Sequence, residues 1–228
     1  MSEQQWMAIL LTFKLAITVT VILMIICTPL AYWLARTENR FKALFNAIFA
    51  LPLVLPPTVI GFYLLIAFGP NGIIGQTNHT LGFSSLLFSF KGLVVASCIY
   101  SLPFVLQPIQ TSIASLGQST FDLANVSGLS PLKTFFKVVL PQAKLGFLTA
   151  IVLGFAHTVG EFGLVLIIGG NIPGQTQLVS LLIFENIEAL EYTQAHHLSL
   201  IMLVFSFVIL FALYWFNQRR NVSWGNIK

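Results

Sequence analysis

Apolar residues fill five long stretches of this chain, and shorter polar segments separate them. A helix of about 20 apolar residues is long enough to cross the roughly 30 Å of hydrocarbon in a bilayer. The pattern therefore predicts five transmembrane helices, which we expect at residues 7–34, 43–68, 92–112, 146–168 and 197–216. Two further apolar runs, 81–90 and 178–184, are too short to cross, so we expect interfacial or re-entrant segments there.

The composition indicates a membrane protein. Hydrophobic residues make up 57% of the 228 residues and charged residues only 8%, whereas a soluble domain contains about 25% charged residues. The first residues, MSEQQW, include no basic side chain, so the first apolar stretch is not typical of a cleaved signal peptide. We therefore expect an all-α integral membrane protein that keeps this stretch as a membrane span.

The basic residues predict the orientation of the chain. Nine of the eleven lie on one side of the five expected spans, namely Arg36, Arg40, Lys42, Lys133, Lys137, Lys144, Arg219, Arg220 and Lys228. Because cytoplasmic loops of membrane proteins are rich in Lys and Arg, this side is predicted to be the cytoplasm. The chain then divides into a short external N-terminus (1–10), a transmembrane domain (11–215) and a cytoplasmic tail (217–228).

Several functional classes find little support in the sequence. No basic cluster is dense enough for nucleic acid, and the glycines lack P-loop spacing, so we expect no ATP site in this chain. His157 and Glu161 are four residues apart, so we expect them to share a helix face, which suits a proton relay, a pair of metal ligands or an acid–base pair. No third ligand lies at a matching depth, so we expect no catalytic residue, no metal site and no bound cofactor. A membrane enzyme built on His157 and Glu161 stays as an alternative.

Prolines interrupt the second and third expected spans in a related way, as LPLVLPP (51–57) and LPFVLQP (102–108). Each proline removes a helical hydrogen bond, and its ring clashes with the preceding turn, which predicts a kink or a break in both helices. Broken helices often line transport paths. Proline is also common in membrane helices generally, so both interpretations stay open.

The polar segment between the third and fourth expected spans has the signals of two short helices. Ser119 is predicted to cap the first helix, and Gly128 to end it in a left-handed conformation. Ser130 followed by Pro131 predicts the start of the second helix, and Pro141 predicts its end.

The second of these helices carries one apolar stripe, formed by Leu132, Phe135, Phe136 and Val139, with lysines on the opposite side. We expect this stripe to pack on the helix bundle. A helix resting on lipid headgroups accounts for the pattern as well as a helix that meets a partner protein. The pattern alone leaves both interpretations open.

The spacing within residues 119–141 resembles the cytoplasmic loop of ABC importer permeases of the type I class. Their motif reads Glu-Ala-Ala, three residues, Gly, nine residues, an aliphatic residue, one more residue, then Leu-Pro. The matching positions are Asp122, Leu123, Ala124, Gly128, Val138, Leu140 and Pro141, with Asp in place of Glu and Leu in place of the first Ala. The resemblance implies a loop of coupling helices that docks in a groove of an ATPase subunit.

Residues 154–177, GFAHTVGEFGLVLIIGGNIPGQTQ, carry a second resemblance. The Gly-Glu-Phe-Gly and Asn-Ile-Pro-Gly runs look like the molybdate permease subfamily, as do the sequence TVIG after residue 57 and the short chain. His157 stands where relatives often have a basic residue. The candidate pathway or gate residues are His157, Gly160, Glu161, Phe162, Gly163, Asn171, Pro173 and Gly174.

Glu161 needs a partner or water, because an acidic residue near the centre of a membrane helix costs roughly 2.5 to 3.5 kcal/mol. Its carboxylate would repel a dianion, so we do not expect it to bind substrate. Glu161 and Lys14 both lie about 10 Å from the outer ends of their spans, which suggests an intramembrane pair. Hydration of Glu161 in an outward-facing cavity is the alternative.

The resemblance implies the ABC type I permease fold and a multi-pass protein of the bacterial inner membrane. It also implies a homodimer of this chain in the lipid bilayer, two ABC ATPase subunits that use ATP and Mg, and an external substrate-binding protein. The expected function is the import of an oxyanion, with molybdate as the expected substrate and tungstate or sulfate as alternatives. A self-contained channel or carrier is the alternative from another class.

Overall fold

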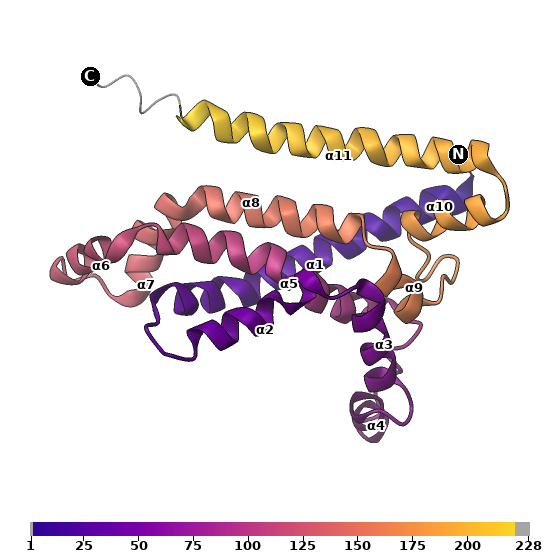
Figure 1. The fold of residues 1–228 in the computed structure, drawn as a ribbon, viewed down its shortest axis with the longest axis horizontal. Coiled ribbons are helices and arrows are strands. Elements are labelled where there is room, and N and C mark those ends of the chain that lie inside the picture. Colours follow the sequence, from indigo (N-terminus) through magenta and orange to yellow (C-terminus); the bar gives the residue numbers. More distant parts are fainter. Residues whose placement is uncertain (1, 222–228) are drawn as a thin grey trace.

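Helices dominate the chain. The computed structural model describes residues 2–221, which contain no strand. The helices are α1 (Glu3–Arg36), α2 (Lys42–Val54), α3 (Pro57–Phe68), α4 (Ile73–Thr80), α5 (Phe90–Ala114), α6 (Gly117–Val126), α7 (Pro131–Thr134), the π-helical turn η1 (Phe135–Val139), α8 (Leu140–Val159), α9 (Gly163–Gly169), α10 (Val179–Glu188) and α11 (Tyr192–Asn221). Figure 1 shows an elongated arrangement, with α6 and α7 at one end and the N-terminus and α10 towards the other.

Five helical segments are long and apolar enough to cross a membrane: Glu3–Arg36, Pro57–Thr80, Phe90–Ala114, Pro131–Val159 and Tyr192–Trp215. Within residues 2–221, the predicted all-α fold with five spans is therefore confirmed. The limits of two spans differ from the prediction, because the chain breaks inside them.

The second predicted span, 43–68, is two helices. α2 ends at Val54 and α3 begins at Pro57. A residue before proline is disfavoured in the α conformation, and Leu55, which precedes Pro56, is extended with φ −73° and ψ 134°. Pro57 occupies the first helical position, where its missing N–H costs no hydrogen bond. The break predicted from the prolines is confirmed here, and α3 turns away from α2 (Figure 1).

The third predicted span contains no break. α5 continues as one helix through Pro103 and Pro108. It is the central helix of the bundle, since half of its most apolar part is buried and it contacts α1, α2, α8 and α9. Neighbours on several sides allow a membrane helix to tolerate prolines. Of the predicted kink or break, the break is therefore absent from α5.

Two glycines let α8 lie close to α5. A Cβ atom on Gly146 would be 2.2 Å from the Cβ of Ser112, and one on Gly154 would be 2.5 Å from Cγ2 of Val105. Neither position has room for a side chain. Small residues at such contacts allow membrane helices to approach closely.

The fourth predicted span, 146–168, is also two helices. α8 ends at Val159 and α9 starts at Gly163, so residues 160–162 form a non-helical link. His157 and Glu161 therefore do not share a helix face, contrary to the prediction. The i, i+4 spacing places two side chains on one face only while the helix continues between them.

Pro141 does not end a helix, contrary to the prediction. α7, η1 and α8 follow one another without a gap, so Pro141 lies in the first turn of α8. Just before it, the N–H of Leu140 donates to the carbonyl of Phe135, five residues back. This π-type turn is wider than an α turn, which relieves the clash of a proline ring with the carbonyl one turn back.

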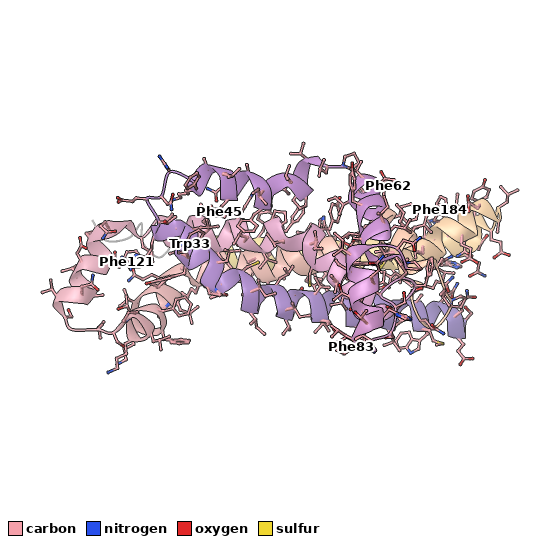
Figure 2. All side chains as sticks on the ribbon, turned by 90° about the horizontal axis from the view of Figure 1, so that it is seen from below. Trp33, Phe45, Phe62, Phe83, Phe121 and Phe184 are labelled. Atoms are coloured by element: carbon pink, nitrogen blue, oxygen red, sulfur yellow. The ribbon has the colours of Figure 1, made fainter. Side chains whose placement is uncertain are left out.

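Aromatic contacts join the outer helices to the bundle. The rings of Trp33 in α1 and Phe45 in α2 lie 5.4 Å apart, side by side in Figure 2. Phe205 of α11 lies 4.8 Å from Phe13 and 6.2 Å from Phe155. Apart from such contacts α11 is largely uncovered along the side of the bundle (Figure 1), with 6% of its most apolar part buried.

The remaining predictions concern short segments. Residues 81–89 form turns rather than a helix, whereas 179–184 lie within α10. The predicted cytoplasmic tail, 217–228, falls in part outside the described residues, and Lys228 lies there.

Candidate functional site

Aromatic packing holds the loop between α5 and α8 against the end of α1. The ring of Phe121 in α6 is buried, and the guanidinium carbon of Arg36 lies 4.2 Å from its centre. The ring of Tyr32 lies 6.3 Å from Phe121 and 5.8 Å from Phe135 of η1. Figure 2 shows Phe121 towards one end of the molecule. The loop is therefore a folded part of the bundle, fixed to α1.

The turn between α6 and α7 is fixed by Gly128. Its φ of +69° is left-handed, as predicted. The N–H of Gly128 donates to the carbonyl of Asn125 at 3.0 Å, and the N–H of Leu129 donates to that of Ala124 at 3.1 Å. These two bonds form a Schellman motif, which satisfies carbonyls at the end of a helix. The predicted end of α6 is confirmed.

The predicted start of α6 is wrong. The helix begins at Gly117, without a side-chain cap, and Ser119 lies in its first turn. Gly117 follows a short turn after α5 and has a φ of +71°, which glycine adopts freely. Pro131 is the first residue of α7 as predicted, but the side chain of Ser130 makes no capping hydrogen bond.

The predicted apolar stripe divides between two faces. Val139 is fully buried and Phe135 packs on Tyr32, but Leu132 and Phe136 are exposed. A π turn changes the angular offset between residues on either side of it, so one ideal stripe no longer faces one way. The expectation that the whole stripe packs on the bundle is therefore wrong.

Five residues of α6, α7 and η1 are exposed, and after the predicted coupling loop we name them the coupling surface: Asp122, Leu123, Val126, Leu132 and Phe136. Leu123 is 70% exposed and Val126 is 88% exposed. Of the other motif positions, Ala124 is buried, Val138 and Leu140 are half-buried and Pro141 is exposed. The carboxylate of Asp122 accepts a hydrogen bond of 3.0 Å from the amide of Gln118. Exposed apolar side chains of this kind are found where a protein meets another protein or the surface of a membrane.

Glu161 connects three parts of the bundle. It is 4% exposed, in the link between α8 and α9. The hydroxyl of Ser97 in α5 donates to its Oε2 at 2.8 Å, and that of Ser180 in α10 donates to its backbone carbonyl at 2.7 Å. Its Oε1 has no partner among the described residues. The carboxylate is thus buried within the chain, and the structure does not place it in an outward-facing cavity.

Lys14 and Glu161 have different neighbours in this structure. The ammonium of Lys14 lies 4.7 Å from the ring centre of Phe90, on an exposed face of α1. Glu161 lies against Ser97 instead. The structure therefore does not bring the suggested pair together within one chain, because Lys14 is on the side of α1 opposite its buried residues.

His157 packs between aromatic rings. Its ring stacks on Phe104 with centres 3.8 Å apart and lies 4.8 Å from Tyr100. Nδ1 is 2.9 Å from the hydroxyl of Ser101, which is in turn 3.1 Å from that of Thr158. Among the described residues no group of three or more His, Cys, Asp or Glu side chains is placed to hold a metal. His157 is a packed residue between α5 and α8.

The Asn-Ile-Pro-Gly run forms an external turn. Asn171 and Gly174 have positive φ values, and the side-chain amide of Asn171 donates to Glu185 of α10 at 3.1 Å. Gln177 donates to the same carboxylate oxygen of Glu185 at 2.7 Å. Pro173 and Gly174 are exposed. The predicted pathway residues thus separate into a group around Glu161, in which Glu161 is buried, His157, Phe162 and Gly163 are half-buried and Gly160 is exposed, and a turn that is largely exposed.

Sequence reasoning missed the serines that hold this link. Ser97 and Ser101 are both buried on α5, and each contacts a residue of the α8–α9 region. Their i, i+4 spacing in an apolar span places them on one helix face, which was the available signal. Ser180 had no such signal, since it lies in the external segment predicted between the fourth and fifth spans.

The comparisons with known proteins fit this geometry. Residues 27–222 match the family described as "Binding-protein-dependent transport system inner membrane component". The chain is 55% identical over 214 residues to the molybdenum transport system permease protein ModB of Azotobacter vinelandii, covering 94% of this chain and 95% of the relative. It is 34% identical to ModB of Haemophilus influenzae, covering 94% of this chain and 96% of the relative.

A solved structure has the same fold. It is a bacterial ABC transporter involved in the import of the acidic polysaccharide alginate, and it is similar with a TM-score of 0.79 at 16% identity. The similarity covers 96% of this chain and 80% of the matched chain. At this identity the likeness concerns the fold alone.

Proposed function

The chain belongs to the family of binding-protein-dependent transport system inner membrane components, and on that premise we propose that it is the permease subunit of an ATP-driven importer for molybdate. The proposal has four parts: docking of an ATPase on the coupling surface, formation of a pathway by two copies, delivery of the anion by an external binding protein, and the choice of anion.

The coupling surface is the observation that carries the proposal. A folded loop presents Leu123, Val126, Leu132 and Phe136 beyond the end of the bundle. Burying such apolar side chains against a partner is favourable at about 25 cal/mol for each Å² removed from water. Arg36 and Tyr32 fix the loop to α1, so a movement imposed on the loop reaches a membrane-spanning helix directly. A self-contained channel has no use for this arrangement.

The energy source is a partner protein. We propose that two copies of an ABC ATPase subunit bind ATP and Mg and dock on the coupling surfaces of two permease copies. This chain then holds no cofactor of its own. Closure of the ATPase subunits on ATP moves the two coupling loops towards each other. The pathway between the permease copies then closes on one side of the membrane and opens on the other.

Delivery of the anion is external. The family name refers to a binding protein, and the N-terminus, the 171–177 turn and α10 all lie at the end of the molecule opposite the coupling loop (Figure 1). We propose that the binding protein docks at this end, on the surface of the homodimer.

The proposed anion is molybdate. The 55% identity to a molybdenum permease over nearly the full length of both chains supports this anion. Tungstate has the same charge and shape and stays as the alternative within the same class. The arrangement around Glu161 agrees with an anion pathway that avoids this group, because the carboxylate is buried and partnered inside the chain.

The test is ATPase activity of the reconstituted complex in proteoliposomes. The full chain is combined with the ATPase and binding protein of the same organism, and molybdate, tungstate and sulfate are added in turn. We expect molybdate to stimulate ATP hydrolysis and to accumulate on the side of the ATPase subunits. Stimulation by sulfate alone would contradict the substrate, and molybdate transport without any ATPase subunit would contradict the mechanism.

A further inference from the structure

One ridge of α5 changes from apolar to polar along its length. Residues at i, i+4 steps form a ridge on a helix surface, and on α5 one ridge runs Val95, Ile99, Pro103, Gln107 and Thr111. Val95 and Ile99, in the outer half, are 38% and 39% exposed. Pro103, in the middle, is buried, and Gln107 and Thr111, in the inner half, are exposed. A ridge that faced lipid along its whole length would stay apolar.

Two hollows flank the polar half of this ridge. One, of about 420 Å³, lies between α2 and α5, and the other, of about 580 Å³, is lined mainly by α5 and α8. Gln107 and Thr111 line both hollows. Since a water molecule takes about 30 Å³ in the liquid, either hollow has room for a tetrahedral oxyanion with several waters.

The side chains in these hollows offer unused hydrogen-bond donors. Within residues 2–221, no partner binds the side chains of Gln107, Thr111 or Thr149, and Thr149 of α8 lines the larger hollow. Four other threonines in the spans, Thr12, Thr18, Thr28 and Thr158, each donate to the carbonyl four residues back, whereas Thr20 and Thr134 have no partner but are buried. Thr111 makes no such bond, although its helix continues on both sides.

The hollows contain no charged side chain. Their polar members are the amides Asn46, Gln107 and Gln110 and the hydroxyls Thr111, Ser112, Ser115 and Thr149. Amide and hydroxyl donors hold an anion without a fixed positive charge. A transport pathway needs binding that is favourable enough for entry and weak enough for exit, and neutral donors meet both conditions.

We propose that Gln107, Thr111 and Thr149 form a donor site that contacts the oxyanion in the inner half of the pathway. This inference rests on the proposed function, and it assigns substrate contacts to α5 and α8. Gln107 lies about 10 Å and Thr111 about 5 Å along the axis from the inner end of α5. Val95 and Ile99, on the outer part of the same ridge, line an apolar part of the pathway. A second copy of the chain encloses the pathway from the other side.

The first experiment removes the donors one at a time. Thr111→Val, Thr149→Val and Gln107→Leu keep the size of each side chain and delete its donor. A neutral hydrogen bond corresponds to about a two- to tenfold effect on binding, so molybdate uptake by the complete complex should fall by that factor in each variant. The matched control is Thr18→Val, the same change on α1, which should alter uptake by less than about twofold.

The second experiment tests whether water reaches the site. In a Cys27→Ala, Cys98→Ala background, Thr111→Cys should react with a membrane-impermeant thiol reagent in the assembled complex. Val204→Cys, on the exposed apolar face of α11, should not react. Molybdate at saturating concentration should slow the reaction of Thr111→Cys.

The outcomes separate the inference from the proposed function. An unreactive Thr111→Cys, or normal uptake by all three donor variants, overturns the donor site. Rapid disulfide cross-linking of Thr111→Cys between copies, with normal uptake by Thr111→Val, shows instead that the ridge joins the two copies by polar contacts. If the wild-type complex does not transport molybdate while Thr111→Cys is water-accessible, molybdate is not the substrate. The inference that water reaches the inner half of the α5 ridge is then retained.

Discussion

The coupling loop and the α8–α9 link are both short motif-bearing segments, and they use their motif residues in opposite ways. In the loop, Leu123 is 70% exposed and Asp122 is bonded only within α6. In the link, Glu161 is 4% exposed and binds serines from two other helices. One motif therefore leaves its residues exposed, whereas the other joins parts of the same chain. A recognisable motif does not by itself say which of the two it does.

Substitution at Leu123 is the strongest way to test this contrast. Leu123→Asp places a charge in the middle of the apolar coupling surface, where docking would bury it. Loss of a central apolar contact costs at least about 2 kcal/mol in an interface, or roughly 30-fold in affinity. We expect ATPase binding and molybdate uptake to fall by at least this factor, measured by co-purification and by uptake in proteoliposomes.

The permease itself should be unaffected by that change. Because Leu123 touches solvent rather than the bundle, the thermal unfolding midpoint of Leu123→Asp should equal that of the wild type. The matched control is Leu81→Asp, at a residue 64% exposed in the external loop, which should leave ATPase binding intact. Equal losses in the two variants would show that the effect is not specific to the coupling surface.

Substitution of Glu161 should have the reverse effect of Leu123→Asp: it should lower the stability of the permease and leave ATPase binding unchanged. Glu161→Ala leaves the buried hydroxyl of Ser97 without its partner, which costs about 1.5 kcal/mol. For a chain of this length that corresponds to a fall of about 3–6 °C in Tm. Differential scanning fluorimetry in detergent measures the change. Affinity for the ATPase subunit should stay at the wild-type value.

The double variant Ser97→Ala, Glu161→Ala sharpens this test. Removing both partners leaves no unpaired hydroxyl, so it should recover part of the lost stability. Glu191→Ala, at an exposed acidic residue after α10, should leave Tm unchanged. A Glu161→Ala variant that keeps its Tm but loses ATPase binding would mean that the link also acts in coupling.

The sequence predicted the number of spans and the end of α6 because these depend on local signals. Long apolar stretches set the spans, and the left-handed Gly128 set the turn. The break at Pro56 was also local. The break at residues 160–162 was not, since no proline marks it and the link is held by Ser97 and Ser180 from distant parts of the chain.

The prolines show most clearly that a local sequence signal does not decide whether a helix ends. Pro56 ends a helix, whereas Pro103 and Pro141 lie inside helical segments. α5 is supported by neighbouring helices, and the start of α8 is supported by a π turn. Those supports arise only from tertiary packing and backbone adjustment. The same dependence explains why the suggested pair of Lys14 and Glu161, placed from depth alone, is not formed in one chain.

Gly128 offers the smallest and most selective test of the contrast. Gly128 and Gly82 have φ values of +69° and +73°, and neither would bring an added Cβ within 4 Å of another atom. Alanine at either position therefore introduces the same strain of about 1 kcal/mol and no steric clash. We expect Gly128→Ala and Gly82→Ala to lower Tm equally. Only Gly128→Ala should also reduce molybdate-stimulated ATPase activity, by about fivefold if the strain shifts the coupling loop, because Gly128 sets the angle between α6 and α7. Equal activity in the two variants would mean that the loop tolerates this change without loss of coupling.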